Sequence, residues 1–177
     1  MIKEKSQSSS IERAEAKDYE DVKALFDHAN DYSVTKDSVP IWVNIDYAYK
    51  QLWSDVEAGN CFVVRTSSGK IAASICITEE DSFTWGDEGA DGQALYFHKL
   101  MKDPAIAPPG VGKELVAFAA SQVLTRGKKY LRCDTRLGTT SLVGYYRRLG
   151  FNQKRVIVYP STKLEAVLLE ADPHSLI

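Results

Sequence analysis

Residues 95–118 read LYFHKLMKDPAIAPPGVGKELVAF, and the succession of patterns in this stretch decides the fold. Its first part, together with Ala94 before it, carries apolar residues on both faces, which is typical of a strand in the middle of a sheet. Two prolines and the sequence Gly110-Val111-Gly112 follow. Apolar residues then recur every four positions, as in a helix that ends at Gly127. The stretch therefore predicts a central strand, a loop and a long helix.

The two glycines at the head of this helix raise the question of a phosphate-binding site. The first turn of a helix leaves backbone N–H groups unpaired and carries partial positive charge, and glycine lets a phosphate approach closely. The same residues could instead only shape a loop and start the helix, since proline is favoured in a first turn. The pattern fits a Walker loop poorly, because Glu114 follows Gly112-Lys113 where that loop needs Ser or Thr. It also lacks the third glycine of a dinucleotide fingerprint.

The rest of the chain alternates between helical and strand patterns within one domain. Helices are expected over 16–30, 45–56, 110–126 and 139–150. Strands are expected over 11–16, 61–66, 70–78, 94–101, 130–135, 155–160 and 165–171, with loops over 31–40 and 79–93. We expect an α/β (α+β) domain over 11–172, with a mixed, mostly antiparallel central sheet of about six to seven strands flanked by helices. Residues 1–10 are expected to form a mobile tail and 173–177 a C-terminal tail.

Composition and charge exclude several classes of protein. The 177 residues are 44% hydrophobic and 26% charged, as in an ordinary soluble domain, and the formal charge of -2 gives no support for nucleic-acid binding. No apolar run approaches the roughly 20 residues of a membrane span. The start MIKEKSQSSS has no apolar core behind its charges, so a secretion signal is not expected and a cytoplasmic location is. Cys61, Cys76 and Cys133 lie far apart in strand patterns, which favours reduced core thiols over a metal site.

The order of four segments resembles the GNAT superfamily of acyl-CoA-dependent N-acetyltransferases. The segments are LYFHKLMKDP, APPGVGKELVAF, YLRCDT and GYYRRLGF, which match a strand, a Gln/Arg-x-x-Gly-x-Gly/Ala loop opening a helix, a strand, and a short helix. The likeness covers roughly 11–172 and is tightest over 95–151. It implies the GNAT fold and transfer of an acetyl group from acetyl-CoA to a primary amine on a small molecule, by a monomer or homodimer without a metal ion. The alternatives are a non-catalytic acyl-CoA-binding module and an enzyme that acetylates a protein amino group.

The resemblance also implies which residues bind the cofactor. The pyrophosphate of coenzyme A would be held by main-chain amides of the glycine loop, at Gly110, Val111, Gly112 and Lys113. The pantetheine arm would be held like an added strand by main-chain groups of Leu100, Met101 and Lys102, at the end of the central strand. Thr139 stands where many family members have an Asn that contacts the cofactor. The loop departs from the family pattern, because Ala107 replaces Gln or Arg and the two prolines after it remove backbone donors.

Two residues are candidates for the proton transfers. The resemblance implies that Tyr146 of GYYRRLGF protonates the departing thiolate, a role that suits a phenol because it donates a proton without permanent charge. The alternative is that Tyr146 only packs on the sheet. His98 on the central strand could take the proton of the amine, since an imidazole titrates near neutrality, or could be a hydrogen-bonded core residue.

The loop over 79–93 is rich in acidic residues and could attract a cationic amine. Glu79 and Glu80 lie nearest the end of a strand and are the best candidates for substrate contact, although a solvated loop is the alternative. Trp42 could line the acceptor pocket or belong to the core.

Overall fold

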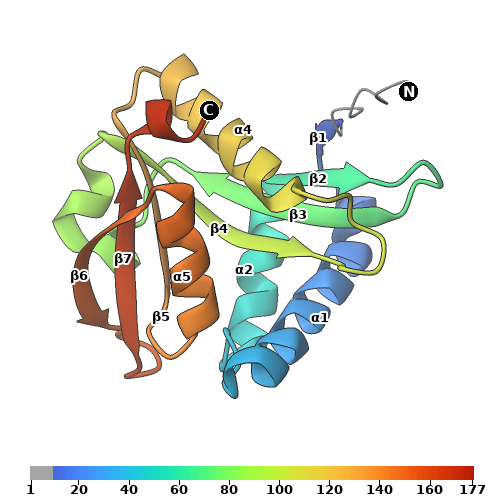
Figure 1. Cartoon of the computed structure of the whole chain (residues 1–177), viewed down its shortest axis with the longest axis horizontal. Coiled ribbons are helices and arrows are strands. Elements are labelled where there is room, and N and C mark those ends of the chain that lie inside the picture. The colour runs from blue at the N-terminus through green and yellow to red at the C-terminus, as the bar shows by residue number, and fades with distance from the viewer. Residues whose placement is uncertain (1–9) are drawn as a thin grey trace, which may run out of the picture.

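The computed structural model describes residues 10–177, so most of the tail predicted over 1–10 lies outside the described residues. The described chain forms one mixed sheet covered by helices on both faces (Figure 1). The strands are β1 (Ile11–Arg13), β2 (Cys61–Arg65), β3 (Ile71–Thr78), β4 (Ala94–Lys102), β5 (Tyr130–Arg136), β6 (Asn152–Val158) and β7 (Glu165–Ala171). The helices are α1 (Tyr19–Asp37), α2 (Ile45–Glu57), α3 (Ser82–Trp85), α4 (Val111–Thr125) and α5 (Thr140–Leu149), with short 3-10 turns η1 (Ala16–Asp18), η2 (Gly86–Ala90) and η3 (Pro173–Ser175).

The strand order is β1-β2-β3-β4-β5-β7-β6, which places β4 in the middle as its two-sided apolar pattern predicts. Within the described residues, β4 and β5 pair in parallel and every other neighbouring pair is antiparallel. The prediction of a mixed, mostly antiparallel sheet is therefore confirmed. The three cysteines are buried and none of them forms a disulfide.

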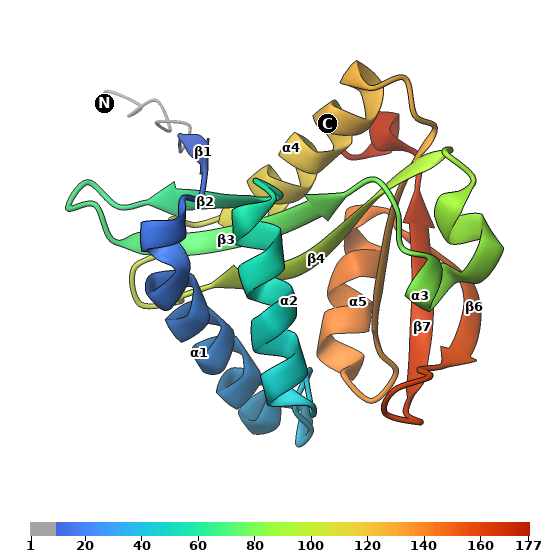
Figure 2. The same ribbon diagram turned by 180° about the vertical axis from the view of Figure 1, so that it is seen from behind.

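The two faces of the sheet bury separate hydrophobic clusters. Helices α4 and α5 cover one face, where Leu95, Phe97 and Leu115 belong to the larger cluster. Helices α1 and α2 cover the opposite face, seen in Figure 2, where Phe26, Leu52 and other residues pack on the sheet. Successive residues of a strand point to opposite faces. Strands β2, β3 and β4 therefore contribute to both clusters.

Strands β4 and β5 pair over only three residues and then separate (Figure 1). Ala94–Tyr96 pairs with Tyr130–Arg132, and the later residues of β4 pair only with β3. A bulge on β4 accompanies the separation: Cys76 opposes His98 but Ser74 opposes Met101, and Lys99 between them adopts a left-handed φ of 51°. The far half of β4 thus has backbone groups without a partner on its β5 side.

Helix α1 is longer than the local pattern predicts. Residues 31–40 were expected to form a loop, but α1 continues to Asp37 and ends where Ser38 adopts a left-handed φ of 63°. The carboxylate of Asp37 accepts a hydrogen bond from the N–H of Ser141, at the head of α5, at 3.1 Å. The prediction was wrong because this contact, more than 100 residues apart in sequence, stabilises the last turn and leaves no trace in the local pattern.

The structure also differs from the prediction over 173–177, where a C-terminal tail is expected and the chain instead folds onto the domain. Pro173–Ser175 forms η3, which begins where the carboxylate of Asp172 accepts from the N–H of His174 at 2.9 Å. Leu176 is buried in the cluster beneath α4 and α5. One apolar side chain with a covered surface to pack on is sufficient to fix the segment.

The loop predicted over 79–93 contains α3 and η2, which fold back on each other. The N–H of Asp81 donates to the carbonyl of Gly89 at 2.9 Å. Within residues 10–177, none of the helices is long and apolar enough to cross a membrane.

We expect Gly89→Ala to destabilise the fold by about 1–3 kcal/mol, a typical cost of overpacking. A Cβ atom at this position would lie 2.3 Å from the backbone oxygen of Asp81, and a backbone atom cannot move aside cheaply. Gly138→Ala is the matched control, since its Cβ would meet nothing closer than 3.5 Å. Urea unfolding of the two variants measures the difference, and equal midpoints would show that the loop is not closely packed.

Candidate active site

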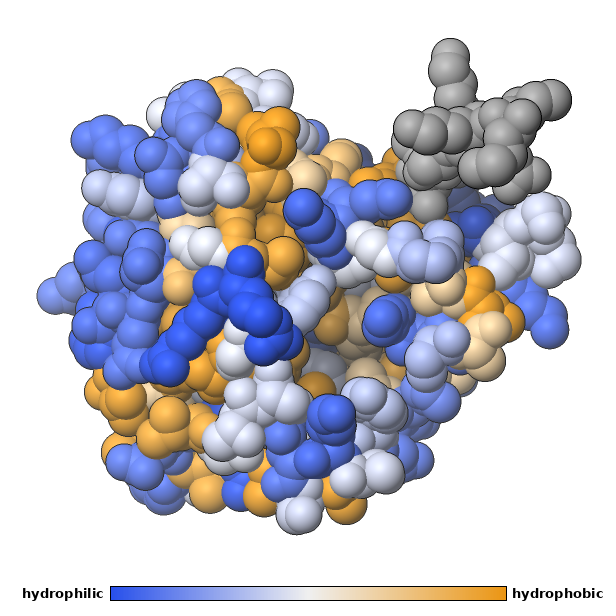
Figure 3. Space-filling model, viewed as in Figure 1, coloured by the Kyte–Doolittle hydropathy of each residue, from blue (hydrophilic) through white to orange (hydrophobic). Residues whose placement is uncertain are grey.

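A cavity of about 310 Å³ opens where β4 and β5 separate. Its wall consists of the segment before α2 and α2 itself, the segment after β3, the separated parts of β4 and β5, α5, and the turn between β6 and β7. Figure 3 shows a hollow near the middle of the face that carries α4 and α5. The wall is mainly apolar and aromatic with a few acidic groups, which is the usual composition of a small-molecule site.

Tyr146 projects from α5 into this wall. It is 5% exposed, and its ring packs edge-on against Phe97 and Phe151, with ring centres 5.7 and 5.8 Å apart. Its hydroxyl makes no hydrogen bond to any residue that the structure describes. Burial raises the pKa of Tyr146 well above its ordinary value, so the phenol keeps its proton at neutral pH. Packing and a free hydroxyl are thus combined in one residue.

Tyr145 points elsewhere. Its hydroxyl lies against Gly112 at the head of α4, where a Cβ atom on residue 112 would be only 2.6 Å away. It does not line the cavity. The two adjacent tyrosines therefore point in different directions, Tyr146 to the cavity and Tyr145 to the head of α4, as expected for residues about 100° apart on a helix.

The head of α4 presents unpaired amides. Gly110 adopts φ 79°, a left-handed conformation that favours glycine, and ends the loop before α4. Among the described residues, the N–H groups of Gly110, Gly112 and Lys113 have no acceptor, whereas that of Val111 donates to the carbonyl of Pro108 at 3.3 Å. Of the four amides that the sequence suggests for a pyrophosphate, three are free in the folded chain.

The segment expected to bind the pantetheine arm is the unpaired end of β4. Met101 and Lys102 pair with β3 on one side and have no strand on the other, and Leu100 lines the cavity. Thr139 lies apart from the cavity wall. Its hydroxyl donates to the carbonyl of Arg136 at 2.6 Å and contacts the hydroxyl of Thr135 at 3.0 Å, so the side chain is used inside the turn that precedes α5.

Three titratable side chains meet on the other side of the cavity. One ligand atom each from Asp81, His98 and Asp134 lies within 4.8 Å of the other two. Nε2 of His98 is 4.0 Å from Oδ2 of Asp81 and 3.3 Å from the hydroxyl of Thr78. The hydroxyl of Tyr159 donates to Oδ2 of Asp134. His98, predicted from the sequence, is thus brought together with two carboxylates.

Burial sets the protonation of this cluster. It raises the pKa of Asp81, and it raises the pKa of Asp134 to about 6 although the hydroxyl of Tyr159 acts in the opposite direction. Burial, helped by the positive charge of Lys99, lowers the pKa of His98 to about 3. The imidazole is therefore neutral at pH 7, and the two carboxyls titrate above their ordinary range.

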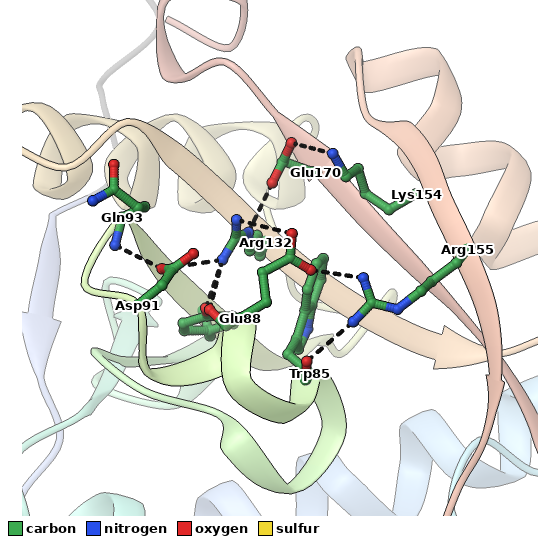
Figure 4. A network of polar contacts seen from close by, with 9 residues as sticks. Trp85, Glu88, Asp91, Gln93, Arg132, Lys154, Arg155 and Glu170 are labelled. Atoms are coloured by element: carbon green, nitrogen blue, oxygen red, sulfur yellow. Dashed lines mark hydrogen bonds and ion pairs between the residues drawn. The ribbon is translucent and has the colours of Figure 1, made fainter.

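A buried ionic network holds the loop that carries Asp81 (Figure 4). Arg132, 2% exposed on β5, donates to Glu170 of β7 at 2.8 Å and to the backbone carbonyl of Glu88 in η2 at 3.1 Å. Arg155 of β6 reaches the carboxylate of the same Glu88 at 2.7 Å. Because Gly89 then bonds directly to Asp81, the network fixes Asp81 at the edge of the cavity.

The bulge on β4 has its own support. Nζ of Lys99 lies 3.2 Å from Oδ2 of Asp55 on α2, and both side chains are about nine-tenths buried. The hydroxyl of Ser74 donates to the carbonyl of Lys99 at 3.4 Å. The left-handed residue is thus anchored at both its side chain and its backbone.

The residues predicted to contact the substrate divide between two places. Glu80 and Trp42 line the cavity, and Trp42 stacks on Phe26 with ring centres 4.2 Å apart. Glu79 lies outside the wall and pairs with Arg126, the residue that follows α4, at 2.8 Å.

Sequence reasoning missed Asp134 and Tyr159. Asp134 does carry a signal, since a carboxylate within the buried strand pattern YLRCDT requires a partner or a function. Tyr159 carries none, because its contact with Asp134 depends on how the turn between β6 and β7 folds back over the site.

The sequence model of the Acetyltransferase (GNAT) family matches residues 22–151 of this chain. A curated relative, the uncharacterized N-acetyltransferase YesJ of Bacillus subtilis, is 27% identical over 100 residues, which are 54% of this chain and 54% of that protein. The match thus spans about half the length of this relative.

Solved structures share the fold over nearly the whole chain. A GNAT-family acetyltransferase from Listeria monocytogenes has a TM-score of 0.73 at 18% identity, with 93% of this chain and 94% of that chain covered. AAC(6')-Ib in complex with ribostamycin and coenzyme A has a TM-score of 0.69 at 13% identity, with 96% of each chain covered. At these identities the likeness establishes the fold alone.

We expect Asp134→Asn to stabilise the fold at neutral pH, by an amount on the order of 2 kcal/mol. The pKa of Asp134 is raised from 3.8 to about 6, so its contribution to stability is fully present below pH 3.8 and is lost as the pH rises through 6. Asn imitates the protonated acid and keeps that contribution. Urea unfolding at pH 7.5 and pH 4 checks this: the advantage should vanish at the lower pH, and Asp87→Asn, which changes an exposed carboxylate of η2, should show none.

Proposed function

The chain belongs to the GNAT family of acetyltransferases, and we propose that it transfers an acetyl group from acetyl-CoA to a primary amine on a small molecule, with Tyr146 as the general acid. One observation carries this proposal. The cavity opens at the separation of β4 and β5, with the free hydroxyl of Tyr146 on one side and the acidic cluster with His98 on the other.

Acetyl-CoA is the proposed cosubstrate, and two features of the chain support its placement. The free amides of Gly110, Gly112 and Lys113 offer hydrogen bonds and partial positive charge to the pyrophosphate. The backbone of Leu100 to Lys102 has no strand on its β5 side, so the amides of the pantetheine arm can bind there in the place of a neighbouring strand. Such contacts use main-chain groups, so the replacement of the family's usual Gln or Arg by Ala107 leaves them in place.

The proposed reaction is a direct attack. The neutral amine nitrogen forms a bond with the thioester carbonyl carbon and gives one proton to the acidic cluster around His98, and the bond from that carbon to sulfur breaks. The thiolate then takes the hydroxyl proton of Tyr146, which regains one from solvent. The raised pKa of Tyr146 keeps the phenol protonated at neutral pH, so that its hydroxyl proton is available when the sulfur leaves. These groups supply the proton transfers without a metal ion.

The size of the cavity favours a small acceptor over a protein. At about 310 Å³ it has the volume of a small-molecule site, and side chains from six helices and strands line it. AAC(6')-Ib, which shares the fold, was solved with ribostamycin and with kanamycin. A non-catalytic acyl-CoA-binding module would have no need for an unpaired phenol and a proton-accepting cluster that face each other across the cavity.

We expect Gly112→Ala to weaken acetyl-CoA binding about tenfold or more, because the added methyl group covers the free amides. That methyl group also collides with the hydroxyl of Tyr145, 2.6 Å away. The double variant Gly112→Ala with Tyr145→Phe removes the collision and should still bind weakly. Calorimetry measures both, and recovery of full affinity in the double variant would show that the collision alone was responsible.

We expect Tyr146→Phe to lower kcat about a hundredfold or more, the usual contribution of a general acid, with the affinity for acetyl-CoA nearly unchanged. The ring and its contacts with Phe97 remain, so the stability should change little. Thiol release from acetyl-CoA with a panel of primary amines measures kcat.

Tyr145→Phe is the control for this experiment, because it removes a hydroxyl that lies outside the cavity wall. Its kcat should stay close to that of the unchanged protein. Normal turnover of Tyr146→Phe, with the chemical step shown to be rate-limiting, would assign the proton to another donor.

A further inference from the structure

Asp81 and Asp134 each have one carboxylate oxygen that makes no hydrogen bond among the described residues, and that of Asp81 is also buried. Oδ1 of Asp81 accepts from the N–H of Thr84 at 3.2 Å, but Oδ2 is fully buried and makes no hydrogen bond among the described residues. The side chain of Asp81 is 10% exposed. Burying a carboxylate oxygen without a donor is costly, so the position indicates a missing donor.

Asp134 presents the second oxygen. Its Oδ2 accepts from Tyr159, and its other oxygen has no hydrogen bond within residues 10–177. Together with His98, the two carboxylates surround one point of the cavity.

We infer that Asp81 and Asp134 form a clamp that captures the acceptor amine in its protonated form, and that Asp134 then accepts its proton. This inference rests on the proposed function, since the captured group is the nitrogen that receives the acetyl group. It assigns the proton-accepting role, which the sequence suggested for His98, to a carboxylate on the neighbouring strand.

The spacing suits an ammonium ion better than a metal ion. Acceptors around a tetrahedral ammonium nitrogen, at hydrogen-bond lengths near 2.8 Å, lie roughly 4.6 Å apart. Ligands of a tetrahedral zinc ion, at bond lengths near 2.05 Å, lie only roughly 3.3 Å apart. The three ligand atoms lie within 4.8 Å of one another, and the separation of Nε2 of His98 from Oδ2 of Asp81 is 4.0 Å, already wider than zinc requires.

The other charges of the cavity wall do not neutralise the clamp. Lys99 is paired with Asp55 at 3.2 Å, and the guanidinium of Arg136 donates to the carbonyl of Pro40 at 3.0 Å. The titratable and charged groups that face Asp134 from the surrounding elements are Asp81, His98, Lys99, Tyr146 and Tyr159. Of these, Lys99 alone is a cation at neutral pH, and it is already bound to another carboxylate.

The clamp lies on the correct side for attack. Tyr96 opposes Arg132 in the parallel pair, so His98 and Asp134, each two residues further on, project from the same face of the sheet. Tyr146 reaches the gap from α5, which covers the opposite face. The amine and the sulfur can therefore occupy opposite sides of the thioester carbonyl carbon, each beside its own proton-transfer group.

The protons balance as follows. The ammonium nitrogen gives one proton to the carboxylate of Asp134, which passes it to solvent. The neutral amine then attacks, and its nitrogen gives a second proton to Asp134 as the bond to carbon forms and the bond from carbon to sulfur breaks. The sulfur takes one proton from Tyr146. One proton is released overall, and the products are the acetylated amine and the free thiol.

The remainder of the wall indicates the body of the substrate. Trp42, Tyr47 and Phe83 line the cavity, and Phe83 is 53% exposed. Aromatic faces favour apolar groups and also attract cations. We therefore expect a primary alkylammonium on an apolar or ring-shaped body, for which benzylamine and butylamine are suitable probes.

The test measures thiol release with these two amines in Asp81→Asn, Asp134→Asn and the control Asp87→Asn. Asp87 lies on the same loop and its side chain is exposed. We expect Asp81→Asn to raise the KM of the amine roughly tenfold or more with kcat within a few-fold, as for a lost charged hydrogen bond. We expect Asp134→Asn to lower kcat about a hundredfold at pH 7 and to recover toward pH 10, where the amine is already neutral. The control should match the unchanged protein.

A second measurement separates the clamp from the reaction. Benzylamine is titrated by calorimetry into the unchanged protein and the three variants, each saturated with coenzyme A so that no reaction occurs. Weaker binding in Asp81→Asn and Asp134→Asn alone supports the clamp, even if the unchanged protein releases no thiol, an outcome that would instead refute the proposed function. Equal amine binding and equal kinetics in all four proteins would overturn the clamp, and so would tight binding of Zn²⁺ alone, lost in both clamp variants, with no binding of the amine.

Discussion

The early end of the pairing between β4 and β5 is the constraint on which the rest of the site depends. Two parallel strands that separate inside a sheet expose backbone N–H and C=O groups, which cannot remain buried without partners. The bulge at Lys99 redirects β4, and the ion pair of Lys99 with Asp55 holds a backbone conformation that is unfavourable for a residue with a side chain. A ligand with its own amides can then complete the sheet, so that the defect becomes a binding site.

The buried carboxylates of the acidic cluster lower the stability of the fold and depend on other contacts to hold them in place. Asp81 and Asp134 are held in a partly dry wall, where burial raises the pKa of each. Neither would remain there without external support. Arg132 and Arg155 tie the loop of Asp81 to three strands of the sheet through Glu88 (Figure 4), and the hydroxyl of Tyr159 retains Asp134. The network around Arg132 is therefore a scaffold for groups that weaken the fold.

The sequence predicts the parts of the fold whose patterns are local. The hairpin of β2 and β3, the central strand β4 and the helix after Gly110 all follow from periodicity and from turn residues. Predictions failed where distant contacts decide, as in the last turns of α1 and the segment around Leu176. The glycine loop and Tyr146 are candidate site residues because a family pattern orders them along the chain. The carboxylate clamp could not be found in this way, since Asp81 and Asp134 are 53 positions apart and meet only through the sheet register and the fold of the loop.

In the mechanism that we propose, the position of the clamp also allows one sheet to separate two opposed proton transfers. The amine must lose protons while the sulfur gains one. A single group near both could not be unprotonated for the first step and protonated for the second. Here the gap between β4 and β5 passes through the sheet, with Asp134 facing the side of α1 and α2, and Tyr146 facing the side of α4 and α5. The buried phenol has its pKa raised well above its ordinary value while the carboxyl titrates near 6, so each group holds the protonation state that its side of the reaction requires. In the proposed reaction, the separation of the strands would thus provide both the space for the thioester and the barrier between acid and base.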